Sequence, residues 1–358
     1  MNPRILLVAT ALCASLPGPA QASTVTLREQ SQAAVDSRGL TGLRVENPRG
    51  LVEVRPSRDG RIHVGALKIA TASERDRAQR FSRLTSVVTS REGGRFVVRV
   101  RYPQHQAVRV SIWGFFRGEF DFPEVEVRLS VEVPPMLPVE IETASGSLET
   151  HDLAGSQSLQ TASGDIEVHD ARAPVTIATT SGNVDASGLG RAQVRSVSGD
   201  VTLEGARGPM SIGTTSGSIH LRGVGDSLAL STVSGDVWVD QAPRGIDAGT
   251  TSGDIQVDGL AAGTVNLRTA SGEVELGLGR GLRRADVATV SGDITLHLAE
   301  DVACNLSLRS ASGDLDSSVP LQIRTVNRHE LSSIVRGGGP PVTLHSTSGD
   351  IAVTGRGR

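Results

Sequence analysis

A Ser-Gly motif recurs at nearly constant spacing along most of this 358-residue chain. Successive serines lie 18, 18, 17, 18, 18, 18, 19, 20, 21 and 36 residues apart. The eleven serines are Ser145, Ser163, Ser181, Ser198, Ser216, Ser234, Ser252, Ser271, Ser291, Ser312 and Ser348. A fixed period near twenty residues is typical of a solenoid, in which one short unit is copied and stacked on itself. So many similar serines argue against a catalytic triad, because a nucleophile is needed once and needs its own base.

Apolar and polar residues alternate on both sides of the motif, which predicts two short β-strands per repeat, each with one buried face. Ile166 and Val168 follow one motif, and Val175 and Ile177 precede the next. The two pairs fall on opposite parities, so both can face one interior only if the chain turns at Ser-Gly-Asp. The fold class predicted is all-β: a single-stranded β-helix of about 18 residues per coil. Equivalent positions should stack about 4.8 Å apart.

The residues around each turn have predicted structural roles. Parity places the Thr or Ser two residues before the serine, and the serine itself, on the inner side, as a hydrogen-bonded stack of hydroxyls. An outward Thr-x-Ser array, as in ice-binding solenoids, is the alternative. The Asp after Ser-Gly, such as Asp165, should accept hydrogen bonds from nearby backbone. Calcium binding is the alternative there, but hard-cation sites need six or more converging oxygens.

The amino terminus has the pattern of a secretory signal. Residues 1–22 contain a basic start, an apolar run and a small-residue site before Ser23. Cys13 would leave with this segment, and Cys304 should then be a single buried thiol, because it shares parity with apolar neighbours. The rest of the chain contains no apolar run near the ~18 residues of a membrane helix. Basic residues are interspersed with acidic ones, so no nucleic-acid partner is expected.

The remaining chain divides into four predicted regions. Residues 23–138 form an early coil around Gly50 and a β-rich cap, 139–318 the regular coils, 319–341 an irregular coil with an outward loop, and 342–358 the final coil and tail. The cap is needed because an open solenoid end exposes core and unpaired strand edges.

One short amphipathic helix is predicted within the cap. It covers about residues 73–84, with Ser73 as N-cap and Ala78, Phe81 and Leu84 on its buried face. Strands are expected around residues 96–102, 108–113 and 125–133.

Two groups of outward residues are candidate partner-binding sites. Trp238 should lie between His220 and Gln256 on one outer column, where an indole can stack on a sugar or a partner. The other group is an aromatic cluster that includes Trp113, Phe115 and Phe116. Its alternative role is to cap the solenoid core, since apolar clusters are usually buried.

Two weaker site hypotheses follow from stacking. His151 and His169 occupy equivalent positions in consecutive repeats and form a possible zinc or copper pair, but such sites need three or four ligands. No metal or cofactor is therefore predicted. The column just before the serines should be a flat outward stripe suited to docking on another solenoid, which permits self-association through solenoid faces.

The tandem TASGDIEV motif, the early NPRGLVEV and the VPPMLPVEIETASG segment resemble a bacterial β-strand-repeat family labelled "putative adhesin", a domain group of otherwise unknown function. The resemblance covers about residues 40–355. It implies an exported right-handed β-helix with a role in attachment or envelope biology, and it brings no catalytic residues.

These observations predict an exported, non-enzymatic, adhesin-like scaffold, periplasmic or at the cell surface. Its partner would be a cell-surface, envelope or glycan component. One alternative is a polysaccharide-active β-helix enzyme, although fold analogy alone supplies no site. Another is a periplasmic accessory of envelope-stress signalling.

Overall fold

The computed structural model describes residues 8–12, 25–103, 124–241, 244–260 and 263–356. The chain forms two compact units, Met1–Gly164 and Asp165–Arg358. The predicted strand at 108–113 and most of the predicted leader lie outside the described residues.

The first unit combines parallel coils with antiparallel strands. Its elements are β1 (Val8–Leu12), β2 (Val25–Asp36), β3 (Gly42–Glu46), β4 (Val52–Pro56), β5 (Arg61–Ala72), α1 (Arg75–Leu84), β6 (Ser86–Glu92), β7 (Arg95–Arg101), β8 (Glu124–Val133), β9 (Val139–Glu142), β10 (Leu148–His151) and β11 (Gln157–Thr161). One sheet has the order β1-β2-β5-β8-β4-β10, and the other has the order β11-β9-β3-β7-β6. In the region predicted as an early coil, β3 and β4 flank Gly50, and their inward side chains are buried.

Antiparallel pairing ends the parallel stack within this unit. β5 pairs antiparallel with both β8 and β2 over long stretches, and β6 pairs antiparallel with β7. Ala78 of α1 is buried in a small apolar cluster with Leu27 and Val125, and Phe81 packs against it. The β-rich cap with one short helix is therefore confirmed in its type of structure.

Two details of the predicted helix are wrong. Glu74, not Ser73, occupies the N-cap position, and its side chain makes no capping hydrogen bond. Leu84 is 51% exposed, while Ser82 is buried. Residues 78, 81 and 82 are spaced i, i+3 and i+4 and share one helix face, whereas residue 84 lies six residues after Ala78 and so about 240° around the helix, on another face.

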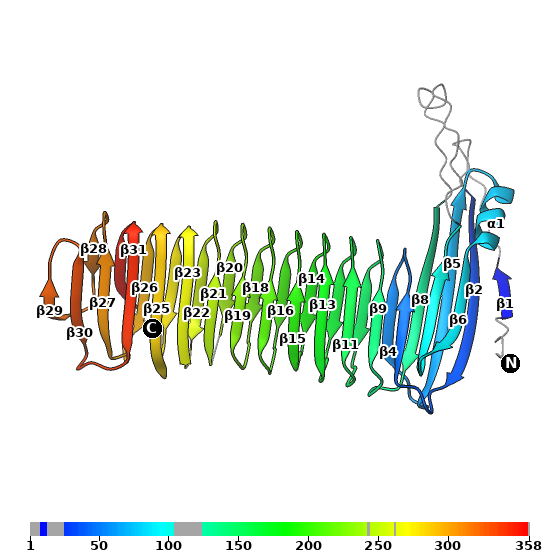
Figure 1. Ribbon diagram of the computed structural model, residues 1–358, viewed down its shortest axis with the longest axis horizontal. Helices are drawn as coiled ribbons and strands as arrows, with labels where there is room; N and C mark the ends of the chain where they lie inside the picture. The colour runs from blue at the N-terminus through cyan, green and yellow to red at the C-terminus, as the bar shows by residue number, and fades with distance from the viewer. Residues whose placement is uncertain (1–7, 13–24, 104–123, 242–243, 261–262, 357–358) are drawn as a thin grey trace, which may run out of the picture. The chain divides into compact units, whose positions relative to one another are not determined.

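The second unit is a stack of parallel coils (Figure 1). Its strands are β12 (Ile166–His169), β13 (Pro174–Thr179), β14 (Val184–Ser187), β15 (Arg191–Arg195), β16 (Val201–Glu204), β17 (Met210–Gly213), β18 (Ile219–Arg222), β19 (Leu228–Ser231), β20 (Val237–Asp240), β21 (Gly245–Gly249), β22 (Ile255–Leu260), β23 (Gly263–Ser271), β24 (Val274–Leu278), β25 (Leu282–Ser291), β26 (Ile294–Ala299), β27 (Cys304–Ser310), β28 (Leu315–Ser317), β29 (Gln322–Val326), β30 (Glu330–Val335), β31 (Pro341–Ser348) and β32 (Ile351–Arg356).

Each regular coil gives one strand to each of two sheets. The even-numbered strands β12 to β26 pair in parallel in one sheet, and the odd-numbered strands β13 to β25 pair in parallel in the other. Ile166 aligns with Val184 and then Val201, and all three are buried. Each such aliphatic side chain contributes about 1.5–3 kcal/mol by leaving water. The β-helix prediction is confirmed, and the core is the column of aliphatics between the sheets.

The corner after Ser-Gly is built differently from the prediction. All eleven serines are exposed, and the following glycine is buried or half-buried instead. A Cβ added to Gly217 would lie 2.0 Å from the carbonyl oxygen of Gly199, and one added to Gly235 would lie 2.0 Å from that of Gly217. The serine is exposed even where a strand extends to it, as in β23 and β25, so the inward–outward alternation does not continue through the corner. Glycine is required here mainly by this close approach of neighbouring coils.

The hydroxyl stack consists of the Thr or Ser two residues before each motif serine, without the motif serine itself. Thr214 is buried, and its Oγ1 accepts a hydrogen bond of 3.1 Å from the Gly217 N–H. Thr232 Oγ1 in the next coil donates to the Gly217 carbonyl at 3.3 Å. The threonines face inward, so an outward Thr-x-Ser array is excluded.

In several repeats the acid after Ser-Gly accepts a backbone hydrogen bond, as predicted, and the donor belongs to a neighbouring coil. Asp200 Oδ1 accepts a hydrogen bond of 2.8 Å from the Ser218 N–H, and Asp236 Oδ1 accepts one of 2.9 Å from the Asp254 N–H. These carboxylates cap the backbone of the next coil, which accounts for a carboxylate at this position without an ion.

The corner seven residues after each serine has a regularity that the sequence reading missed. The residue there has a positive φ in seven consecutive repeats: Asp152, Asp170, Gly188, Gly205, Gly223, Gln241 and Gly259. Four of the seven are glycine, which adopts this conformation without strain. The alternation of Gly with Asp and Gln at a fixed offset was the signal available in the sequence.

The last coil is not at the end of the stack, contrary to the prediction. β31 pairs in parallel with both β25 and β27, and β32 pairs with both β26 and β28. The coil formed by β31 and β32 therefore lies between two coils that precede it in sequence. In Figure 1 the red β31 stands between β25 and β27. The local pattern of every coil is alike, so the pattern alone could not reveal this order.

Residues 319–341 also differ from the predicted outward loop. β29 and β30 form an antiparallel hairpin, and β30 pairs antiparallel with β27. The hairpin continues the sheet beyond β27 and leaves β29 as its edge, with Ile323 57% and Val326 63% exposed.

Candidate functional site

A shallow groove of about 580 Å³ lies on the outer face of the sheet that contains β16, β18, β20 and β22. We call it the aromatic groove. Its outward lining residues come from equivalent positions of four consecutive coils: Thr202, Glu204, His220, Arg222, Trp238, Asp240, Gln256 and Asp258. The groove exists because parallel coils in register place the same outward position of each coil side by side.

The three predicted residues of this face come together as expected. His220 aligns with Trp238, and Trp238 aligns with Gln256. The His220 and Trp238 rings are stacked, with centroids 4.2 Å apart and planes inclined by 14°. One face of the indole is therefore covered by the imidazole. A sugar cannot stack on that face, and the groove offers ring edges and neighbouring polar groups instead.

Charged side chains flank the aromatic pair. Arg222 Nε lies 3.7 Å from Asp240 Oδ2, with both side chains at least half exposed, so the ion pair contributes little to stability. Gln256 Nε2 donates a hydrogen bond of 3.4 Å to Asp258 Oδ2. The arrangement provides both donors and acceptors beside an apolar surface, as partner-binding surfaces often do.

The predicted aromatic cluster cannot be placed in the same way. Trp113, Phe115 and Phe116 lie outside the described residues, and their role stays a prediction.

Histidine appears in one group of three metal-ligating side chains among the described residues. Ligand atoms of Glu53, Glu149 and His151 lie within 4.8 Å of one another in the first unit. Arg55 forms an ion pair with Glu53, so one of the carboxylates already has a cationic partner. His169 belongs to the other unit, where its Nδ1 lies 3.0 Å from Ser187 Oγ. The predicted pairing of His151 with His169 stays a prediction.

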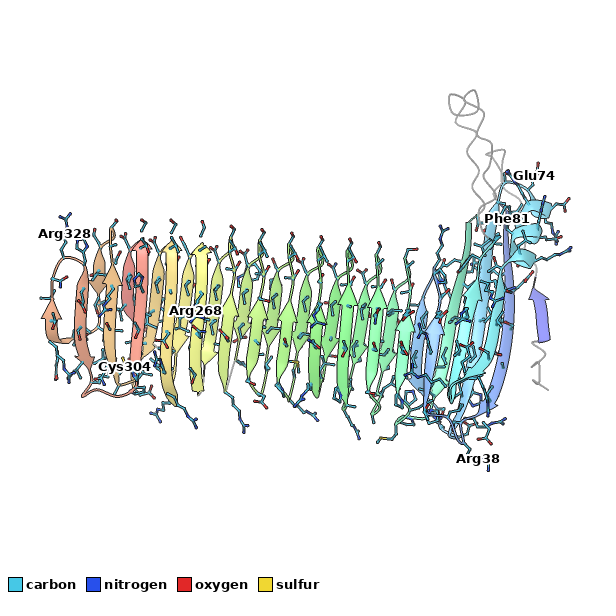
Figure 2. All side chains as sticks on the ribbon, in the orientation of Figure 1. Arg38, Glu74, Phe81, Arg268, Cys304 and Arg328 are labelled. Atoms are coloured by element: carbon cyan, nitrogen blue, oxygen red, sulfur yellow. The ribbon has the colours of Figure 1, made fainter. Side chains whose placement is uncertain are left out.

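Cys304 is buried on β27, as predicted (Figure 2). Burial raises the pKa of its thiol to about 11. Because the thiolate is the reactive form, this position disfavours a reactive or intermolecular role.

The fold and the site together define a parallel β-solenoid with an antiparallel cap and with grooves formed by repeated outward positions. The chain belongs to the Toastrack DUF4097 family, whose model matches residues 52–244 and 193–354. No curated protein matches it. No helix within the described residues has the length and apolar character needed to cross a membrane.

Solved structures with similarity to this chain include three bacterial proteins. A "putative cell adhesion protein" from Clostridium sporogenes is 8% identical, with 92% of this chain and 100% of that chain covered and a TM-score of 0.21. A "putative lipid binding protein" from Parabacteroides distasonis is 13% identical, with 92% and 97% covered and a TM-score of 0.29. A "putative adhesin" from Parabacteroides merdae is 10% identical, with 92% and 96% covered and a TM-score of 0.29. At such values the likeness carries no argument about function.

Proposed function

We propose that this protein is an exported, non-enzymatic scaffold that binds a cell-surface, envelope or glycan component through the outer faces of its coils. The observation that carries the proposal is the aromatic groove, in which His220, Trp238 and Gln256 lie in register on consecutive coils. Tryptophan is enriched where partners bind, because it combines a large apolar surface with a hydrogen-bond donor. Export is supported by the leader-like pattern of residues 1–22.

The repeat supports a binding role rather than catalysis. The serines that resemble an active-site residue occur in eleven repeats and are exposed at a corner, and neighbouring acids accept backbone hydrogen bonds. Catalysis needs a unique arrangement of groups, whereas a repeated surface suits the binding of a repeated or extended partner.

The test compares binding of the purified chain with that of Trp238→Ala and His220→Ala to a glycan array and to whole bacterial cells. We expect each substitution to reduce binding at least about fivefold, as expected for loss of a contact worth about 1 kcal/mol. Val233→Ala, at an exposed apolar residue outside the groove lining, is the matched control. Equal binding by Trp238→Ala and the parent chain, or turnover of a polysaccharide, would contradict the proposal.

A further inference from the structure

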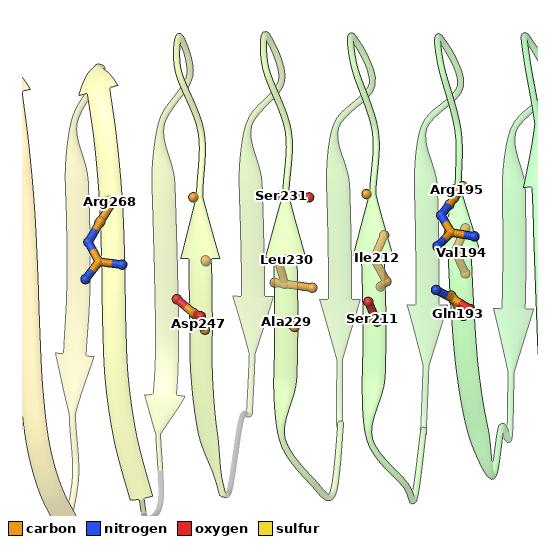
Figure 3. A pocket seen from close by; sticks show the side chains of 13 residues that line it. Gln193, Val194, Arg195, Ser211, Ile212, Ala229, Leu230, Ser231, Asp247 and Arg268 are labelled. Atoms are coloured by element: carbon orange, nitrogen blue, oxygen red, sulfur yellow. The ribbon is translucent and has the colours of Figure 1, made fainter.

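A second groove, of about 420 Å³, lies on the outer face of the other sheet, across β15, β17, β19, β21 and β23 (Figure 3). We call it the arginine trough. Its floor is low because one outward column carries small residues in three consecutive coils. That column runs through Arg195, Gly213, Ser231, Gly249 and Arg268, which are aligned in register from strand to strand.

The two arginines mark the ends of this low floor. They are separated by four strand spacings, or about 19 Å. Both side chains are exposed, and neither forms an ion pair or a side-chain hydrogen bond in the part of the chain that the structure describes. This contrasts with Arg222 on the opposite face, which lies near Asp240. Figure 3 shows the two guanidinium groups on either side of Ser231.

The second row of the trough supplies hydrogen-bonding groups. It contains Gln193, Ser211, Ala229 and Asp247 at aligned positions. Asp247 Oδ1 accepts a hydrogen bond of 2.7 Å from Asn266 Nδ2, and this leaves further lone pairs of the carboxylate for a ligand. An extended occupant would therefore meet cationic donors at both ends and a carboxylate acceptor near one of them.

We infer that the arginine trough binds an acidic polysaccharide, lying across the coils with an anionic group at each arginine and hydroxyl groups over the row between them. Guanidinium groups form bidentate hydrogen bonds to carboxylate or sulfate. The Asp247 carboxylate accepts from sugar hydroxyls, which an acidic peptide or a nucleic acid backbone offers poorly. With two arginines and one carboxylate, the trough also carries little net positive charge, whereas a nucleic-acid site needs several cations to neutralise phosphates. The inference rests on the proposed function, because it assumes a binding scaffold and adds to it a class of ligand and a second binding surface.

The test uses the whole purified chain and oligogalacturonate, which carries one carboxylate per sugar, as the probe. Its methyl ester is the matched neutral probe. We expect the acid to bind and the ester to bind at least about tenfold more weakly, because charge-assisted hydrogen bonds contribute about 1.5–3 kcal/mol each. Binding should also weaken as salt rises from 0.05 to about 0.5 M, since the contacts are solvent-exposed.

Substitutions locate the site. Arg195→Gln and Arg268→Gln should each weaken oligogalacturonate binding about tenfold, and the double variant more than about fiftyfold, with circular dichroism unchanged. Ser231→Phe should obstruct the floor without altering charge. Arg207→Gln, at an exposed arginine outside the lining of both grooves, is the matched control and should bind like the parent chain.

Trp238→Ala separates this inference from the proposed function. It should leave oligogalacturonate binding intact while it reduces binding to the glycan array or to cells. If the parent chain binds only oligogalacturonate, the proposed role of the aromatic groove fails; if it binds only the array or cells, the inference about the arginine trough fails. Equal affinity for the acid and its methyl ester, parent-like binding by the double arginine variant, or tighter binding of polyglutamate than of oligogalacturonate would overturn the inference.

Discussion

The coils that stack in chain order and the inserted last coil make the same contacts, but with neighbours at different separations along the sequence. In the regular stack, a Cβ on Gly217 would meet the carbonyl oxygen of Gly199 at 2.0 Å, 18 residues earlier. In the inserted coil, a Cβ on Gly349 would meet that of Gly292 at 2.0 Å, 57 residues earlier. The carboxylate contact is also reproduced, since Asp293 Oδ1 accepts a hydrogen bond of 2.7 Å from the Asp350 N–H.

The contacts between two coils are therefore alike whichever coil is the neighbour, and they do not determine the order of the coils. Any coil presents an aliphatic column, a corner glycine and an acceptor oxygen to the next one. The order must therefore be set by the connections. Between β28 and β31 the chain first forms the β29–β30 hairpin and then returns to lie beside β25 and β27. The entropy of closing a longer loop grows only slowly with its length, so such a return is tolerated.

The largest expected effect is disulfide formation between two introduced cysteines, which tests the order of the strands. Asp286 and Thr343 are register partners on β25 and β31, so the double variant Asp286→Cys/Thr343→Cys should form a disulfide almost completely under mild oxidation. Asp286→Cys/Ser307→Cys should not, because β31 separates these strands and places the Cα atoms about 9.6 Å apart. Non-reducing electrophoresis and peptide mapping measure both. The reverse result would establish stacking in chain order.

The second effect compares the glycine corners. Gly217→Ala and Gly349→Ala should each reduce the free energy of unfolding by about 3 kcal/mol or more, because the added methyl group collides with a backbone carbonyl. Gly249→Ala is the matched control: its Cβ would be no nearer than 3.8 Å to the atoms around it, and we expect a change within about 0.5 kcal/mol. Denaturant titration followed by circular dichroism measures all three. A small loss for Gly349→Ala alone would mean that the inserted coil is loosely docked.

The third effect concerns the buried threonines. Thr214→Val should cost about 1–3 kcal/mol, because the Gly217 N–H loses its acceptor in a buried corner. Thr215→Val, at the next and exposed position, should change stability little, and valine already occupies the equivalent Val197 and Val233. The same titration distinguishes the two variants. Equal losses would contradict the inward role of the threonine column.

The smallest effect concerns the carboxylates between coils. Asp200→Ala and Asp293→Ala should each cost about 1 kcal/mol, by removing one hydrogen bond to the backbone of the next coil. Asn keeps the acceptor oxygen, and Asn183 already fills the same role toward Asp200, so Asp→Asn should restore most of the loss. Hydrogen exchange at the Ser218 and Asp350 amides provides the local measurement. A loss at Asp200 alone would break the equivalence of the two regions.

Much of the solenoid could be predicted from the sequence because alternation reports burial directly. Ile166 and Val168 are inward as predicted. The serines were misplaced because the inward–outward alternation does not continue through the corner, even where a strand extends to the serine. The order of the last coils was hidden because identical patterns fit any neighbour equally well.

The candidate site could be predicted in part. The register of His220, Trp238 and Gln256 follows from the period, but the covered indole face does not follow from parity alone. The arginine trough was missed, although its signal was present: two arginines at the same offset before the serine, with only small residues at that offset in the three repeats between them.

The glycine corner has a consequence for how such a chain can change over generations. Since each coil offers the next one the same template, duplication or deletion of one repeat in the gene alters the number of stacked units while every junction keeps its chemistry. The length of the stack, and the distance between groups on its surface, can thus change with the number of repeats while the residues of the core stay the same.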